Sequence, residues 1–220
     1  MSFAEQLRGF GLAGIAAMLL ILLTGNVFVG PMIVLPVGAA LVLVWVAASA
    51  TPWRDVGYVR PRSWMAAIAI GTLGGVALKL AMKAVVMPML GADPVNRPYH
   101  FLAGNRAMLP AAVWAMLAAG FGEETVFRGY LFERGRRLLG SGTAAKVAIV
   151  FITSAWFGAA HFVGQGWAGV AQATVVGLVL GGIYAVTGRL FTLMIAHAAF
   201  DLTALFLIYY SLEERVAHVL

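Results

Sequence analysis

The chain has 220 residues, of which 62% are hydrophobic and only 11% carry a charge. Soluble domains usually carry about 25% charged residues, and apolar runs long enough to cross a bilayer, about 20 residues each, recur along this sequence. The composition therefore excludes a soluble globular protein and predicts an all-α, polytopic membrane protein. The absence of cysteine from the sequence also excludes disulfide bonds and a thiol nucleophile.

Seven apolar runs predict a bundle of about seven transmembrane helices, which form a single integral membrane domain over 1–220. The runs cover residues 9–29, 31–50, 64–88, 108–131, 145–163, 167–187 and 190–211. The first two runs meet at Gly30-Pro31, where the sequence predicts either a hairpin or one kinked segment. The first run has no convincing small-residue cleavage site, so we expect a transmembrane helix there and not a removed signal peptide.

The segments between the apolar runs predict the orientation of the chain. Polar loops are expected at 51–63, 91–107 and 133–144, with short turns at 164–166 and around Gly188. On the side of the N-terminus there are nine basic residues, namely Arg8, Arg54, Arg60, Arg62, Arg134, Arg136, Arg137, Lys146 and Arg189. The opposite side has three, namely Arg97, Arg106 and Arg215. Because cytoplasmic loops are enriched in Lys and Arg, we expect a cytoplasmic N-terminus in a bacterial inner membrane.

The positive net charge of +6 does not indicate a nucleic-acid partner, because orientation in the membrane accounts for the basic residues. The partners that we expect are the lipid bilayer and a peptide or protein substrate. Lys79 and Lys83 lie late in the third run, and we expect their side chains to extend to the far interface.

Ionisable side chains inside the predicted helices are few, and such residues are functional candidates. They are Glu123, Glu124, Arg128, His161, His197 and Asp201. At about 1.5 Å rise per helical residue, the acidic residues and the histidines lie roughly 12–22 Å from the basic flanks of their helices. Three helices thus place their polar residues at similar depth, which predicts a buried site in the middle of the membrane.

The spacing of these residues predicts which of them share a helix face. Glu124 and Arg128 are four residues apart, in the order that favours an ion pair. Glu123 is turned by about 100° from Glu124 and is expected to face a cavity. The same spacing of four recurs in the pairs Phe157 and His161, and His197 and Asp201.

These residue types are suited to hydrolysis. A carboxylate in a low-dielectric pocket can act as a general base toward water, and a histidine with a second hydrogen-bonding group can stabilise an oxyanion. No serine or threonine has an obvious activating base, so water is the expected nucleophile. Two histidines and a carboxylate would also suit zinc with an open position for water. Metal-bound and metal-free water therefore both stay open at this point.

Three motifs follow one another on the last helices: EETVFR at 123–128, FGAAH at 157–161 and HAAFD at 197–201. Together they resemble the CPBP intramembrane protease family, which includes the CAAX prenyl endopeptidases and the bacteriocin-processing or immunity-type (Abi-like) proteins of bacteria. The resemblance covers roughly residues 108–205. It implies a protease core at 108–211, in the last four helices, and accessory helices at 1–107.

The resemblance implies an intramembrane endopeptidase whose polar cavity opens toward the cytoplasm and admits a peptide, membrane-associated or lipidated. The catalytic residues that it implies are Glu123, His161, His197 and Asp201, and the supporting residues are Glu124, Arg128 and Phe157. In this assignment Glu123 activates the water and His161 assists.

His197 and Asp201 would form the oxyanion-stabilising side of such a site. The family is commonly labelled metalloprotease, so a zinc ion at His161 and His197 is the competing assignment. The last motif ends in Asp201 and not in asparagine, and an aspartate donates a hydrogen bond only when it is protonated. Metal ligation or orientation of a histidine is therefore a more attractive role for Asp201.

Two other functions fit the same sequence. A non-catalytic scaffold or bacteriocin-immunity type protein would keep the fold and bind a partner, and it would tolerate Glu123→Gln. A small transporter would use buried acids and histidines as a proton relay, but the sequence shows no inverted repeat.

Overall fold

The computed structural model describes residues 2–28 and 33–218, and the protein is almost entirely helical. The N-terminal segment is a hairpin. It contains α1 (Phe3–Arg8), α2 (Leu12–Thr24), the two-residue antiparallel strands β1 (Val27–Phe28) and β2 (Val34–Leu35), and α3 (Val37–Ala48). The break that we predicted at Gly30-Pro31 lies outside the described residues.

The two helices of this hairpin are shorter than the sequence predicts. α2 has 13 residues and α3 has 12, whereas a helix needs about 20 residues to cross the hydrocarbon core. Gly25, with φ at +43°, ends α2, and Pro36 caps the start of α3. Apolar composition alone does not reveal these breaks, so the spans predicted at 9–29 and 31–50 are wrong as continuous helices.

The next segment leads from the hairpin to the first long helix. A short 3-10 turn, η1 (Trp53–Val56), precedes α4 (Trp64–Ala81), which continues through a π-helical turn, η2 (Met82–Val86), into α5 (Met87–Met89). The loop that follows contains a second 3-10 turn, η3 (Arg97–Leu102).

The helix that carries the glutamates is longer than predicted. α6 (Leu109–Glu124) continues through a second π-helical turn, η4 (Thr125–Tyr130), into α7 (Leu131–Leu139). The loop expected from residue 133 is therefore helical up to Leu139. Arg134 is buried in α7 because its guanidinium lies 4.5 Å from the Trp45 ring and pairs with Glu133.

The last helices follow the predicted pattern closely. They are α8 (Thr143–Ala160), α9 (Phe162–Thr187), α10 (Phe191–Tyr209) and the short α11 (Glu213–Ala217). The turn predicted at 164–166 is confirmed as a break in α9, where Gly166 has φ at +61° and ψ at −161°. The turn around Gly188 is also confirmed, because this residue ends α9 in the left-handed conformation.

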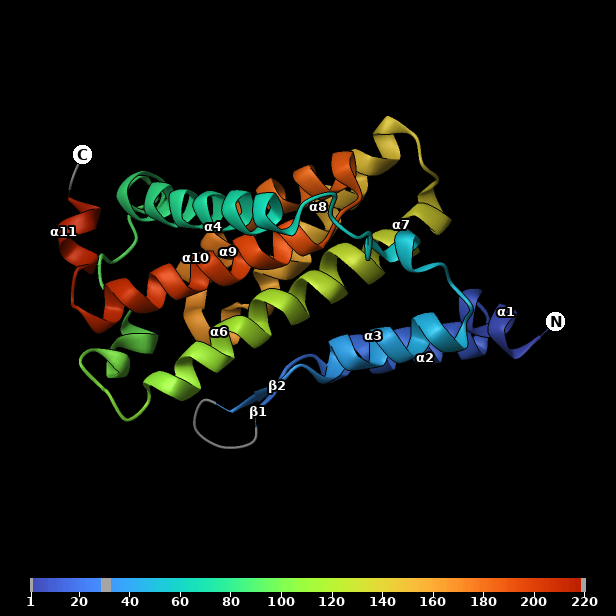
Figure 1. Ribbon diagram of the computed structural model, residues 1–220, viewed down its shortest axis with the longest axis horizontal. Helices are drawn as coiled ribbons and strands as arrows, with labels where there is room; N and C mark the ends of the chain where they lie inside the picture. The colour runs from blue at the N-terminus through green and yellow to red at the C-terminus, as the bar shows by residue number, and fades with distance from the viewer. Residues whose placement is uncertain (1, 29–32, 219–220) are drawn as a thin grey trace.

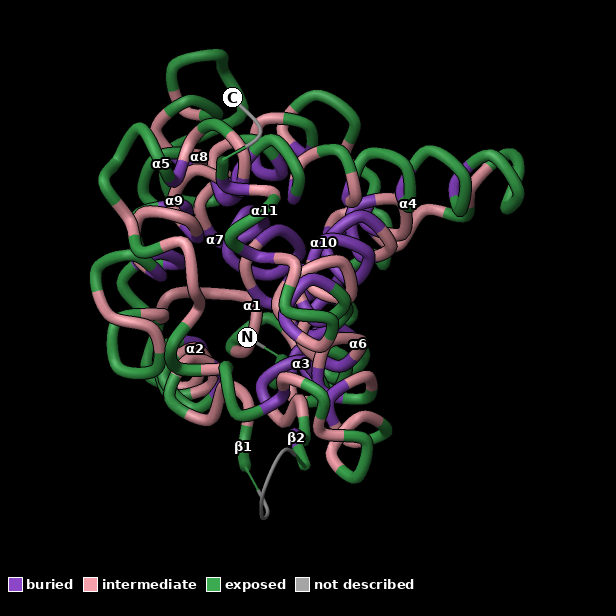
Figure 2. The backbone as a smooth tube through the Cα atoms, turned by 90° about the vertical axis from the view of Figure 1, so that its left-hand side faces the viewer, coloured by how far each residue is buried: buried purple, intermediate pink, exposed green. Residues whose placement is uncertain are grey.

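α10 lies in the middle of the bundle, between α4 and α6, while α8 and α9 pack against each other behind it (Figure 1). The α2/α3 hairpin runs along the other side of α6 (Figure 1). Viewed from one end, buried residues concentrate around α10 and the outer surface of α4 is exposed (Figure 2). The two termini lie at opposite ends of the molecule (Figure 1).

Glycine allows α10 to approach its neighbours closely. A Cβ atom on Gly120 of α6 would lie 2.6 Å from the backbone nitrogen of Ala198, and one on Gly75 of α4 would collide with the carbonyl oxygen of Ala196. Small residues serve the same purpose at many helix contacts in membranes. Both contacts flank His197, so they set the spacing of helices around the predicted site.

Four helices in the described part of the chain are long and apolar enough to cross a membrane: 64–89, 143–160, 162–187 and 191–209. The helical membrane bundle is thus confirmed, but the number of seven spans is not. The orientation predicted for two lysines is wrong, because Lys79 and Lys83 are buried and do not reach the lipid interface. Their partners lie inside the protein.

Candidate active site

A buried ion pair anchors the site. Arg128 Nη1 donates a hydrogen bond of 2.7 Å to Glu124 Oε1, and neither side chain is more than 2% exposed. The pair lies where α6 continues into the π-helical turn η4. Short π-helical segments within α-helices occur frequently at functional sites. Arg128 also contacts the carbonyl oxygen of Gly177 on α9 at 3.4 Å, so the pair connects two helices.

Glu124 also orients His197, a contact that the sequence did not predict. Its Oε1 atom lies 2.8 Å from Nδ1 of that histidine, across from α6 to α10. A carboxylate paired with arginine only accepts hydrogen bonds, so Nδ1 of His197 is the donor. The ring therefore directs its other nitrogen, Nε2, toward the remaining acidic groups.

Two carboxylates surround this nitrogen. Nε2 of His197 lies 3.6 Å from Asp201 Oδ2 and 3.8 Å from Glu123 Oε2. Unlike Glu124, which is fully buried, Glu123 keeps 18% of its side chain exposed and Asp201 keeps 21%. The structure thus brings together the three residues on one wall of an accessible space.

Phe157 packs at the centre of the remaining contacts. Its ring lies 4.7 Å from the guanidinium of Arg128, 4.7 Å from the His161 ring and 5.8 Å from the His197 ring. His161 Nδ1 lies 2.7 Å from the carbonyl oxygen of Phe157. Since a carbonyl only accepts, this contact places the proton on Nδ1 and leaves Nε2 of His161 as a free acceptor.

Asn26 is a residue of the site that sequence reasoning missed. Its side-chain Nδ2 donates a hydrogen bond of 3.2 Å to Glu123 Oε1, and it comes from the turn between α2 and β1. The sequence carried only a weak signal, an asparagine after a glycine inside an apolar run. That run predicts a membrane helix, which places the residue far from the motifs.

A cavity of about 530 Å³ joins these groups. Its polar lining consists of Asn26, Lys79, Asn96, Tyr99, Glu123, His161, Gln165, Gln172, His197 and Asp201. Burial, together with the charges of Asp201 and Glu123, raises the pKa of Tyr99, so its hydroxyl stays neutral beside them. A space of this size falls within the range of known ligand pockets.

The loop between α5 and α6 contributes to the wall of the cavity. Its lining outside the long helices includes Asn96, Tyr99 and Leu102, which belong to the loop between α5 and α6. This loop lies at the end of the molecule opposite to the N-terminus (Figure 1). Part of the cavity wall thus comes from the end of the molecule opposite to the N-terminus.

The donors as arranged do not fit a zinc site. Within residues 2–28 and 33–218, no three His, Asp or Glu side chains form a group that could hold a metal ion. Nδ1 of His197 is directed to Glu124 and Nδ1 of His161 to a backbone carbonyl, so only the two Nε2 atoms are available, and among the described residues they do not form a group of three donors with a neighbouring acid. We therefore derive no catalytic step through a metal.

The hydroxyl groups near the motifs are engaged with the backbone. Thr125 Oγ1 donates to the carbonyl oxygen of Phe121 at 2.8 Å, and Thr203 Oγ1 donates to that of Ala199 at 2.7 Å. Both are i to i−4 contacts within a helix. Neither threonine has a base beside it among these contacts, so water is the nucleophile that the arrangement favours.

Comparison with known proteins agrees with the motifs. Residues 105–203 match the family described as type II CAAX prenyl endopeptidase Rce1-like. No curated protein and no solved structure gives a significant match to the chain. The matched segment includes all three motifs, while Asn26 and Lys79 lie outside it.

The Arg128–Glu124 pair generates a prediction on stability. Arg128→Met or Glu124→Met leaves one charge buried without its partner, so each should lower the free energy of unfolding by about 3–5 kcal/mol. The double variant should recover much of this loss but stay inactive, because His197 lacks its acceptor. Thermal unfolding in detergent and peptide cleavage measure the two effects. Losses that simply add, or an active double variant, would contradict this account.

Proposed function

We propose that Glu123 activates the water that cleaves the peptide substrate of this protein. Residues 105–203 match the Rce1-like family of CAAX proteases, so the protein is an intramembrane endopeptidase. One observation carries the proposal. Of two adjacent glutamates, Glu124 is buried and accepts from Arg128 and His197 through Oε1, whereas Glu123 faces the cavity. Only Glu123 lies where a water molecule in the cavity can reach it.

In the proposed reaction, Glu123 takes a proton from a water molecule as the water oxygen attacks the scissile carbonyl carbon. The carbonyl π electrons move to the oxygen and give a tetrahedral oxyanion. Glu123 then transfers the proton to the departing amine as the carbon–nitrogen bond breaks, so the carboxylate is regenerated. His161, through its free Nε2, assists in orienting the water.

His197 faces the oxyanion in this scheme. Its Nε2 is the ring nitrogen nearest to both cavity carboxylates, and a proton held there would be donated to the oxyanion. An ionised Asp201 cannot donate, so we assign it the role of holding the Nε2 proton of His197 in place. Oxyanion stabilisation thus rests on histidine and not on the last residue of the third motif.

Asn26 is a positioning residue in the proposal. It binds Oε1 of Glu123, which leaves Oε2 facing His197. We propose that 108–211 forms the protease core and that 1–107, although accessory in sequence, completes the site through this contact. We also propose a lipid-modified substrate, which the family description, prenyl endopeptidase, supports.

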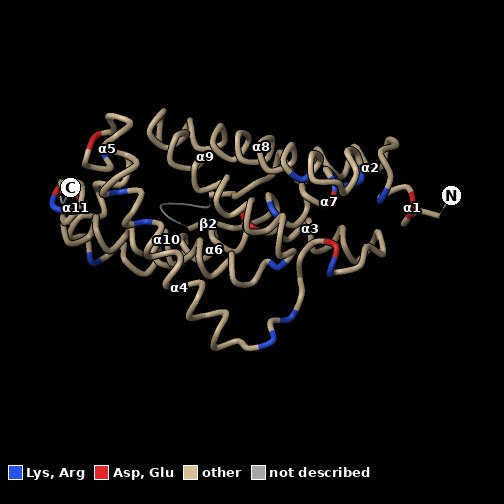
Figure 3. The backbone as a smooth tube through the Cα atoms, turned by 90° about the horizontal axis from the view of Figure 1, so that it is seen from above, with Lys and Arg blue, Asp and Glu red and all other residues tan. Residues whose placement is uncertain are grey.

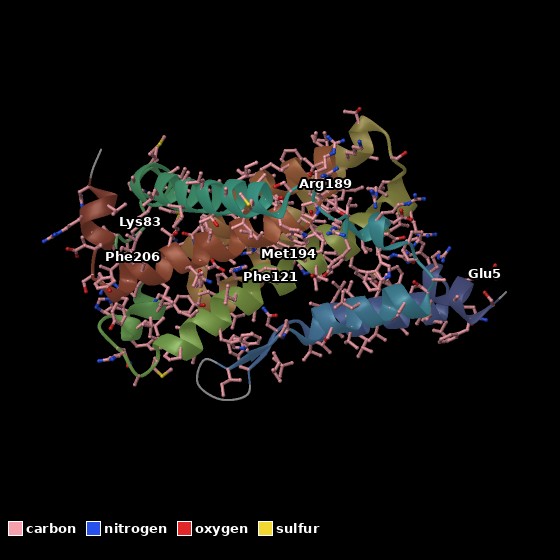
Figure 4. The ribbon with its side chains drawn as sticks, viewed as in Figure 1. Glu5, Lys83, Phe121, Arg189, Met194 and Phe206 are labelled. Carbon is pink, nitrogen blue, oxygen red and sulfur yellow. The ribbon has the colours of Figure 1, made fainter. Side chains whose placement is uncertain are left out.

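We also propose that the N-terminus is cytoplasmic. Nine Lys and Arg residues belong to the segments predicted on the side of the N-terminus and three to the opposite side. In the structure, Lys and Arg are spread along the length of the molecule (Figure 3). Arg189 lies in the half of the molecule that carries Glu5, and Lys83 lies toward the other end (Figure 4).

Glu123→Gln tests the proposed base. The amide keeps the shape of the side chain but cannot take a proton, so cleavage of a mixed peptide library by the purified protein should fall by at least about 100-fold. Thermal unfolding should be unchanged, and a chelator should not inhibit the wild type. The exposed Glu214→Gln is the matched control. If Glu123→Gln cleaves as well as an active wild type, the proposed mechanism is wrong. Such a result would favour a scaffold or transporter role.

Substitutions at Asn26 separate hydrogen bonding from packing. Asn26→Ala removes the donor to Glu123 and should lower kcat by about 10- to 100-fold with little change in KM. Asn26→Asp keeps the shape but places a carboxylate against Glu123, so it should be no more active than the alanine variant. A packing role would give the reverse order, with aspartate close to wild type.

Single cysteines test the orientation directly, because the sequence contains none. Arg54→Cys and Arg106→Cys place a thiol at exposed positions in loops at the two ends of the molecule. An impermeant maleimide added to intact cells should label Arg106→Cys, and should label Arg54→Cys only after the membrane is opened. The opposite pattern would contradict the cytoplasmic N-terminus.

A further inference from the structure

Lys79 of α4 is a buried cation without a matching anion. It is only 5% exposed. Its Nζ donates to Oε1 of the neutral Gln172 at 3.0 Å and lies 4.7 Å from the centre of the Phe200 ring. In the described part of the chain, none of the ion pairs includes Lys79. An ammonium group has three donors, and Gln172 uses one of them.

Lys83, one turn further along the same helix, is a buried lysine whose charge is neutralised by a carboxylate. Its Nζ pairs with Glu213 of α11 at 3.4 Å and donates to the carbonyl oxygen of Pro94. A buried charge is costly unless it is paired. Unlike Lys83, Lys79 has no carboxylate partner among the described ion pairs. Its ammonium group is therefore available to bind an anionic group of a ligand.

The position of Lys79 shows where such an anion would bind. The residue lines the catalytic cavity and also a second cavity of about 180 Å³ beside it. Asn96, Gln165 and Gln172 line both cavities as well. Because Gln172 accepts from Lys79 through Oε1, its own NH₂ group remains a donor. The junction thus offers one positive charge and amide donors, a combination suited to a carboxylate.

We propose that Lys79 is a substrate subsite that binds a carboxylate group of the peptide. The inference rests on the proposed function, since it takes the cavity at Glu123 as the place where the peptide is cleaved. The carboxylate has two sources, the C-terminal α-carboxylate of the peptide or an acidic side chain. Asp201 lines the same cavity, so balancing its charge is the competing role for Lys79.

The experiment compares matched peptides on matched variants. Library peptides that the wild type cleaves are remade in three forms: with a free C-terminus, with a C-terminal amide, and with Glu or Asp replaced by Gln or Asn. The proteins are the wild type, Lys79→Met, Lys79→Arg and, as a charge control, the exposed Lys146→Met. KM and kcat are measured for each pair.

The subsite predicts a loss of discrimination. The wild type should prefer one carboxylate form over its neutral counterpart by at least about 10-fold, mainly in KM, and the form that matters identifies the source. Lys79→Met should lose this preference, because its KM rises for the carboxylate form far more than for the neutral form. Lys79→Arg should keep part of it, and Lys146→Met all of it. If Lys79→Met lowers the cleavage of carboxylate and neutral peptides equally, the subsite proposal is wrong. Lys79 would then serve to balance the charge of Asp201.

Binding to the inactive Glu123→Gln protein gives a second measurement that needs no turnover. Fluorescence anisotropy should show tighter binding of the preferred carboxylate peptide than of its neutral form, and Lys79→Gln should abolish the difference. A wild type that does not discriminate the forms overturns the subsite even if the lysine variants fail to fold. Failure of the proposed function is distinct, because cleavage would then not depend on Glu123 at all.

Discussion

The buried contact of Arg128 with Glu124 is the interaction on which the rest of the site depends. Two charges in a low-dielectric interior are tolerated only when each is paired and hydrogen-bonded. Here the guanidinium also stacks on Phe157 of α8 and contacts Gly177 of α9. The carboxylate in turn accepts from His197 of α10. One ion pair thus connects four helices and fixes the orientation of His197.

Because of helix geometry, the two adjacent glutamates face different surroundings and are suited to different roles. Successive residues of a helix point about 100° apart, so Glu124 faces the packed interior while Glu123 faces the cavity. A single residue could not both neutralise Arg128 and accept a proton from water. In the proposed reaction the oxyanion role, expected for His197 and Asp201 together, falls to His197, whose ring is held by Glu124 on one side and faces Asp201 on the other.

The half of the chain without motifs contributes directly to the cavity. Asn26, from the N-terminal hairpin, binds Glu123, and Lys79, from α4, closes the far wall next to Gln172. Both residues lie outside the segment that matches the protease family. In the proposed function the matched segment supplies the chemistry, and Asn26 and Lys79 add contacts from outside that segment.

The sequence by itself determined the membrane class, the helical architecture, the last turns at Gly166 and Gly188, and the residues that meet in the core, because hydropathy, glycine punctuation and i, i+4 spacing are local properties. It also predicted the pairing of Glu124 with Arg128, which lie on one helix face. Only the tertiary structure decided that Glu124 orients His197, that Asn26 reaches Glu123 and that Lys79 is buried, since these contacts join residues 73, 97 and 93 positions apart. Such contacts depend on how helices pack, and neither local spacing nor the composition of a single run encodes that packing.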